Sequence, residues 1–284
     1  MLILNPFGFF SDFSGSGLPA DFPTALTSSV TMYFDGSNYE SGSGIWVDRI
    51  SSYALDVSSL THSGSYFYFS QSPHSYASPN AGFTPNVAGQ GTFVVHHRNS
   101  NTSSGSRDSG YNTDTLQGSI AHFGSGSSNI CLERSFLTNI SPVGAELRYR
   151  PTFRFSTIAT GSFQESAGTT SLPRSIDGPY ESTFMTEAIK IMSATAWTGS
   201  TQVTFWSDQS DQSGSVSTSN TYFTGIPSGS FLYLGTSVNQ ETGAINSGSN
   251  TDTGPITGSI GDVLYFDRYL DNSELMLLRD YLLG

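Results

Sequence analysis

The sequence predicts an all-β protein, an antiparallel β-sandwich with one short helix at its C-terminal end. Charged residues make up only 12% of the 284 residues and glycine occurs 30 times, a composition typical of short strands joined by many turns. Before residue 271 there is almost no long amphipathic helical pattern. A chain of this length can bury a substantial core, and sandwiches of this size are commonly single domains.

Strand-like runs recur from residue 30 onward, separated by segments rich in Ser, Gly and Asn that indicate surface loops. The predicted strands are Val30–Phe34, Ser65–Phe69, Gly91–His97, Ser119–Phe123, Glu146–Phe155, Phe184–Met192, Thr201–Trp206, Ser230–Leu234 and Ser259–Asp267. The predicted loops are Asn99–Gly110, Gly124–Asn129, Ser207–Asn220 and Asn239–Gly254. We therefore assign residues 30–284 to one sandwich domain.

The end of the chain predicts a closing strand, a turn and a helix. Ile260, Val263 and Tyr265 alternate loosely with small or polar residues, as on a strand with one covered face. Asp271 followed three residues later by Glu274 is a capping box, which begins a helix. The apolar residues that follow at helical spacing are Leu275, Leu278, Tyr281 and Leu282. We expect Tyr265, Leu275, Leu278 and Tyr281 to be buried against the sandwich.

Residues 258–284 resemble the end of laminin-G-like, concanavalin A-like jelly-roll domains, in which a strand G-x-I-x-x-V-x-x-Y-x-R-x-L precedes a small helix. Val30–Asp48, with its aspartate, Gly/Ser turn and Trp-x-Asp, resembles the opening strand of the same family. Weaker matches lie between them, at residues 118–126, 190–206 and 229–235. The chain departs from the family where Trp206-Ser-Asp-Gln replaces the usual Tyr-Val-Asn-Gly. The resemblance implies a concanavalin A-like jelly roll.

Charge and cysteine content exclude several classes of partner. The net charge is −12 with a single lysine, Lys190, and such a chain repels phosphate backbones and anionic membranes. We therefore expect neither nucleic acid nor membrane as a partner. Cys131 is the only cysteine, so an intrachain disulfide is impossible.

Residues 1–29 read as an apolar arm. Three prolines, Pro6, Pro19 and Pro23, exclude a helix or a central strand there, and aromatic residues are scattered between them. We expect this arm to anchor the domain to a neighbouring subunit or another protein, and the chain to form a homo-oligomer. The first ten residues lack the positive region of a signal peptide, so synthesis in a cytoplasm is expected.

Catalytic patterns are missing from the sequence. No two acidic residues are two positions apart, the strand spacing that would place a pair of glycosidase carboxyls on one face. There is also no Gly-x-Ser-x-Gly nucleophile elbow. The sequence therefore predicts that the protein is not an enzyme.

Candidate binding residues are few. His96 and His97 are adjacent, so on a strand they point to opposite faces and cannot share a metal ion. Calcium is the one cofactor we consider, because hard oxygen ligands are plentiful; the candidate ligands are Asp35, Asp48 and Asp262. Alternatively, Asp35 forms a turn before Gly36 and Asp262 is a solvated strand residue.

Sugar binding would use an exposed aromatic ring that stacks on a pyranose. Trp206, next to a predicted loop, and Trp197 are the candidates, whereas Trp46 occupies a position where the family has a core or edge aromatic residue.

Two functions follow from these observations. The first is a phage virion structural or accessory protein, a head decoration, fibre or tail subunit located in the virion. Its lectin-like domain would contact other virion proteins and glycans of the host surface. The second is a microbial carbohydrate-binding or glycan-cleaving protein of the laminin-G or glucanase type. Fold resemblance alone does not decide between them.

Overall fold

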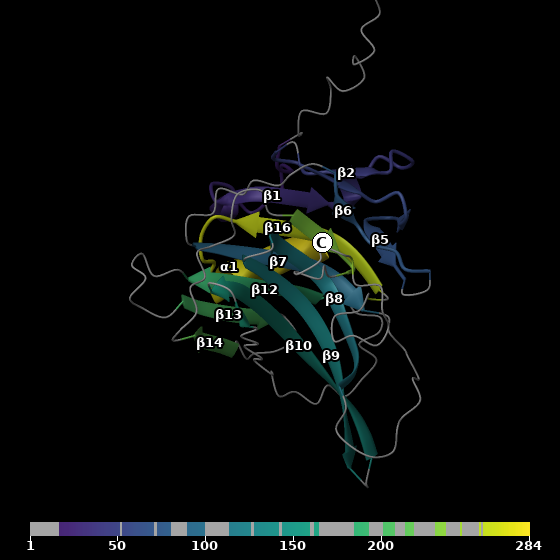
Figure 1. The fold of residues 1–284 in the computed structure, drawn as a ribbon. Coiled ribbons are helices and arrows are strands. Elements are labelled where there is room, and N and C mark those ends of the chain that lie inside the picture. The colour runs from purple at the N-terminus through teal and green to yellow at the C-terminus, as the bar shows by residue number, and fades with distance from the viewer. Residues whose placement is uncertain are drawn as a thin grey trace, which may run out of the picture.

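The structure is a computed structural model. It describes residues 17–51, 53–70, 73–80, 90–99, 114–125, 128–141, 144–159, 162–164, 185–192, 201–207, 214–218, 231–236, 245, 256 and 258–284. Within these ranges the chain forms antiparallel sheets and one C-terminal α-helix, which confirms the predicted fold class (Figure 1).

The largest sheet has eight strands, and β16 (Gly258–Phe266) lies near its middle. Its order is β14 (Gly214–Thr218), β13 (Thr201–Ser207), β12 (Met185–Met192), β7 (Gln90–Asn99), β16, β5 (Tyr66–Phe69) and β4 (Thr61–Ser63). The eighth strand, β1 (Val30–Asp35), also pairs with β16. Thus β1 and β5 share one edge of β16: residues 262–266 pair with β1, and residues 258–260 pair with β5.

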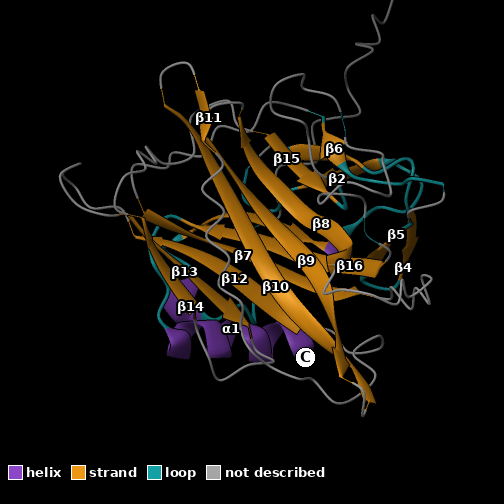
Figure 2. Cartoon of the chain, turned by 60° about the horizontal axis from the view of Figure 1, so that its bottom comes forward, coloured by secondary structure: helices purple, strands orange, loops and turns teal. Residues whose placement is uncertain are grey.

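A second sheet of five strands faces the large one. Its order is β11 (Ser162–Gln164), β10 (Gly144–Ala159), β9 (Ser128–Ser141), β8 (Asp114–Ser125) and β15 (Phe231–Leu234). A small third sheet contains β2 (Ile45–Val47), β3 (Ala54–Asp56) and β6 (Ser78–Pro79). Short 3₁₀ turns, η1 (Thr24–Leu26) and η2 (Gly36–Asn38), flank β1. Figure 2 shows β8, β9 and β10 on one side of the large sheet and α1 (Asn272–Leu283) on the other.

Two predicted loops contain strand instead. Residues 214–218 form β14 within the predicted loop Ser207–Asn220, although this segment is rich in serine and poor in large apolar residues. Residues 124–125 and 128–129 are the paired ends of β8 and β9, so the predicted loop Gly124–Asn129 is a short hairpin connection. Residues 100–110 and most of 239–254 lie outside the described residues.

Two apolar clusters hold the layers together, one on each face of the large sheet. The inner cluster, between the sheets, includes Phe34, Trp46, Phe67, Phe93, Ile120, Leu232 and Tyr265. The outer cluster, beneath α1, includes Phe22, Leu26, Tyr33, Trp206, Leu264, Leu275 and Leu278. Neighbouring residues of β16, such as Leu264 and Tyr265, enter different clusters, because successive side chains of a strand point to opposite faces. Burial on both faces explains why residues 263–266 are all apolar.

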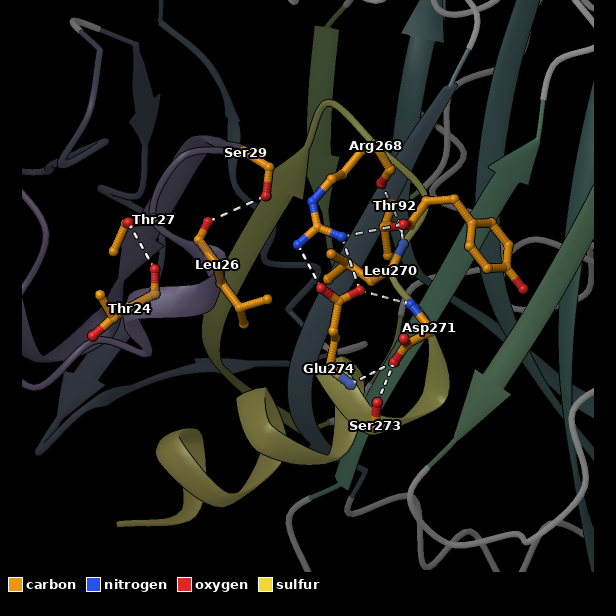
Figure 3. Close-up of polar contacts among 11 residues, drawn as sticks. Thr24, Leu26, Thr27, Ser29, Thr92, Arg268, Leu270, Asp271, Ser273 and Glu274 are labelled. Atoms are coloured by element: carbon orange, nitrogen blue, oxygen red, sulfur yellow. Dashed lines mark hydrogen bonds and ion pairs between the residues drawn. The ribbon is translucent and has the colours of Figure 1, made fainter.

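The C-terminal helix has the predicted cap. Asp271 Oδ1 accepts from Glu274 N at 2.9 Å, and Glu274 Oε2 accepts from Asp271 N at 2.9 Å. Arg268 donates to both carboxylate oxygens of Glu274, at 2.8 and 2.6 Å, which ties the helix start to the end of β16 (Figure 3). No helix among the described residues is long and apolar enough to span a membrane.

Three of the four residues predicted to be buried are fully buried: Tyr265, Leu275 and Leu278. Tyr281 is only half-buried, so for this residue the prediction is wrong. It lies on the helix flank, where its ring meets Phe22 edge-on at 5.2 Å between centroids.

The described part of the N-terminal arm packs on the sandwich itself. Phe22 and Leu26 are buried in the outer cluster, with Leu18 partly buried against it. Residues 1–16 lie outside the described residues. The predicted anchoring of residues 1–29 to another subunit therefore stays a prediction.

Candidate functional site

The junction at which β1 and β5 meet along β16 contains buried polar side chains, among them Asp35 and Asp262. The register of β16 against β7 shifts between Ile260 and Asp262, which makes Gly261 a β-bulge. The backbone is tightly packed here: a Cβ atom on Gly36 would lie 2.1 Å from Ser65 O and 2.4 Å from Gly261 O. Only glycine fits such a close approach of two chains.

Two of the predicted calcium ligands, Asp35 and Asp262, are direct partners across β1 and β16 at this junction. Asp35 accepts from Arg49 Nε at 2.6 Å and from Ser37 N at 2.7 Å. Asp262 Oδ1 accepts from the hydroxyl of Tyr33 at 3.2 Å. The two carboxyl side chains are nearly inaccessible, with Asp35 4% and Asp262 8% exposed, so Asp262 is not the solvated residue that we considered.

Burial and proximity decide the charge of this pair. Burial, and after it the nearby Asp35 carboxylate, raise the pKa of Asp262 to about 8, although hydrogen bonds from Tyr33 and the Gly36 backbone oppose the rise. The pKa of Tyr33 is also raised, first by burial and then by Asp262 and Asp35. Asp262 therefore keeps its proton at neutral pH, while Asp35 forms an ion pair with Arg49.

The third predicted calcium ligand, Asp48, has a different set of contacts. It is fully buried and accepts from the backbone N–H groups of Tyr33, Ile50 and Ser51 at 2.7, 3.1 and 2.9 Å. Burial raises its pKa, while these hydrogen bonds oppose the rise. Through these hydrogen bonds Asp48 links the turn after β2 to β1. In the described part of the chain no three His, Cys, Asp or Glu side chains form a group that could hold a metal ion.

Of the two tryptophans predicted to bind sugar, the structure describes only Trp206. Trp206 is 5% exposed and belongs to the outer cluster, so the expectation that it is exposed is wrong; the helix and the N-terminal segment cover that face of the sheet. Trp197 lies outside the described residues. Trp46 is a core residue, as the alternative held, and its indole N–H donates to Asp35 O at 2.9 Å.

An aromatic surface that the sequence analysis did not single out lies on β5. Its sequence, Tyr66-Phe67-Tyr68-Phe69, places both phenylalanines in the inner cluster and turns both tyrosines to the opposite face. Tyr68 is 38% exposed, and Tyr66 is half-buried. The alternation of Tyr and Phe was the available signal, because residues two apart on a strand share a face.

The histidines are placed as the strand pattern predicts. Val94 lies in the outer cluster and Val95 in the inner one, so the neighbouring His96 and His97 point to opposite faces. Both are buried. Burial lowers the pKa of His96 to about 3, and His97 contributes to this shift. These residues form no shared metal site.

Comparison with known proteins identifies the fold. No family model matches the chain, and no curated protein matches it by sequence. Among solved structures, the binding domain of botulinum neurotoxin DC, in complex with rat synaptotagmin II, is similar with a TM-score of 0.54 and 11% identity over 90% of this chain and 52% of that one.

Two further structures are similar at lower scores. Trypanosoma rangeli sialidase in complex with sialic acid gives a TM-score of 0.46 and 13% identity over 90% of this chain and 33% of that one. The Ruminococcus gnavus IT-sialidase CBM40 gives a TM-score of 0.34 and 14% identity over 68% of this chain and 84% of that one. The chain thus spans about a third of the sialidase and half of the toxin domain. Together with the sheet topology, the toxin comparison shows that the chain folds as an antiparallel β-sandwich.

Proposed function

We propose that this chain is a binding module that recognises carbohydrate and does not cleave it. The observation that carries this proposal is the tyrosine-bearing face of β5, where Tyr68 is 38% exposed on a rigid sheet. Aromatic rings offer apolar faces at low entropic cost and carry a hydroxyl for hydrogen bonding. Similarity of the fold to a toxin binding domain supports a binding role, although fold alone does not assign a ligand.

The buried acids favour binding over cleavage. A glycosidase places two carboxyl groups on either side of the scissile bond. Asp35 and Asp262 are paired, but they are 4% and 8% exposed, and they accept from Arg49, Ser37 and Tyr33. A polysaccharide cannot reach them without disrupting the junction of β1 and β5.

The test uses the full chain on a printed array of oligosaccharides, followed by a turnover assay on every glycan that binds. We expect binding to at least one glycan and no release of reducing ends. Hydrolysis that disappears in an Asp35→Asn or Asp262→Asn variant of unchanged fold would overturn the non-catalytic assignment. Absence of binding to all glycans would overturn the carbohydrate assignment.

A role in a virion is a second, sequence-based proposal. It rests on the acidic, Ser/Gly-rich composition and on the apolar segment at residues 1–16; the three structures compared above are sialidase-related or toxin domains. Because Phe22 and Leu26 belong to the outer cluster, a deletion should remove only residues 1–16. If this segment mediates assembly, the full chain sediments as an oligomer and the shortened chain as a folded monomer; identical sedimentation would contradict the proposal.

A further inference from the structure

The outer face of the large sheet presents a cross-strand row of polar and aromatic residues beside the β1–β5 junction. Tyr68 on β5 pairs with Thr61 on β4 and with Ser259 on β16, and Ser259 pairs in turn with Arg98 on β7. Directly paired residues of antiparallel strands share a face. The row therefore runs Thr61, Tyr68, Ser259 and Arg98 across four strands.

Tyr66 forms a second aromatic position on the same face. A Cβ atom built on Gly261 would lie 2.8 Å from Tyr66 Cδ1 and 2.9 Å from Cε1. The ring of Tyr66 therefore lies against the glycine backbone of β16, in space that any other residue at position 261 would occupy. This backbone supports the ring of Tyr66, and the residue as a whole is half-buried.

Charged and hydroxyl-bearing residues lie near these rings. The pKa of Tyr66 is raised, chiefly by burial and then by Asp262, while Arg98 opposes the rise. An acid and a guanidinium therefore lie close enough to Tyr66 to act on its hydroxyl. Thr61 is exposed and adds a hydroxyl that can donate and accept.

We propose that Tyr66 and Tyr68 form a carbohydrate-binding platform for an uncharged oligosaccharide, with Thr61 and Arg98 hydrogen-bonding to its hydroxyl groups. This inference rests on the proposed function and names its site and ligand class. Residues two apart on a strand are separated by about 7 Å, which lets the two rings contact neighbouring sugar units of one chain. A net charge of −12 disfavours acidic glycans, because the field of the whole protein repels them.

The experiment compares Tyr68→Ala, Tyr66→Ala and Tyr68→Phe with the parent chain by calorimetric titration of the tightest-binding neutral oligosaccharide from the array. The matched control is Tyr233→Ala, a half-exposed tyrosine on β15 of the other sheet. We expect each alanine variant at the platform to bind at least about tenfold more weakly. Tyr68→Phe, which keeps the ring, and Tyr233→Ala should stay within about threefold of the parent.

The outcomes separate the platform from the proposed function. If the parent binds a neutral glycan and both platform alanine variants bind it equally well, the platform is wrong while carbohydrate binding stands. Binding confined to acidic glycans, and weakened by added salt, would overturn the ligand class. If the parent binds no glycan, both proposals fail.

Discussion

Asp35 and Asp262, from opposite ends of the chain, face each other across β1 and β16 in a nearly inaccessible part of the fold. Two ionised carboxylates in that position would repel each other strongly, because like charges directly opposite on a sheet destabilise it. The fold avoids this repulsion in two ways. Arg49 Nε forms an ion pair with Asp35 Oδ2 at 2.6 Å, and the environment of Asp262 raises its pKa to about 8.

Stability should therefore fall with rising pH. In the folded chain Asp262 keeps its proton up to about pH 8, whereas its ordinary pKa is 3.8. Between these values the folded state binds more protons than the unfolded state, so the free energy of unfolding decreases by at most about 1.4 kcal/mol per pH unit. Denaturant unfolding at a series of pH values measures this slope.

Asp262→Asn should remove most of that slope, because the amide cannot ionise and can still accept from Tyr33. The control is Asp267→Asn, at an exposed position just after β16, which should keep the slope of the parent. A slope that persists unchanged in Asp262→Asn would show that another group is responsible.

Removal of Arg49 should be costly. The side chains of Arg49 and Asp35 are 14% and 5% exposed, and loss of the cation would leave a buried carboxylate without its ion-pair partner. We expect Arg49→Ala to lower the free energy of unfolding by about 3 kcal/mol or more. The pair of Arg279 and Asp280 on α1, whose side chains are 24% and 62% exposed, provides the more solvated comparison: Arg279→Ala should cost less than about 1 kcal/mol. Equal costs for the two variants would contradict the structural role of the Arg49 ion pair.

Gly36 should tolerate no side chain. In Gly36→Ala the new Cβ would meet two backbone oxygens at 2.1 and 2.4 Å, one in the turn between β4 and β5 and the other in β16, so both segments would have to shift. Gly42 has φ of +88° but open space around it, so Gly42→Ala should cost only about 1 kcal/mol. Thermal unfolding of both variants measures which of them loses more stability. A Gly36→Ala variant as stable as Gly42→Ala would show that the junction is looser than described.

The C-terminal helix gives a graded set of variants. Asp271→Ala removes the cap and should cost about 1 kcal/mol. Leu278→Ala removes a fully buried side chain and should cost on the order of 2–5 kcal/mol. Met276, 39% exposed on the same helix, is the matched apolar control, and Met276→Ala should change stability by less than about 0.5 kcal/mol. If all three variants unfold like the parent, the helix does not stabilise the sandwich.

The elements with a strong apolar signal could be predicted from the sequence. β1, β5, β7, β12 and β16, together with the capped helix, lie within one or two residues of their predicted bounds. β14, the Ser-rich Gly214–Thr218, and the three short strands of the small sheet have little local pattern, so their pairing depends on neighbours from elsewhere in the chain.

The candidate site depends on pairings that no local pattern reveals. Asp262 meets Asp35 only because β16 pairs with β1 from the other end of the chain. Trp206 looked exposed because it precedes a polar segment, but α1 packs over its side of the sheet. The shared outward face of the tyrosines on β5 follows from strand alternation alone, so these residues could have been identified from the sequence.

The position of β16 also sets the order in which this chain can fold. Its neighbours β1, β5 and β7 all precede it, and they meet their partner only when residues 258–266 have been synthesised. Until then, the apolar faces of these strands have no common neighbour, and the many contacts between distant residues slow the search for the native topology. Completion of both clusters is therefore a late, cooperative step in folding, and a nascent chain that lacks its last thirty or so residues has aggregation-prone strand edges.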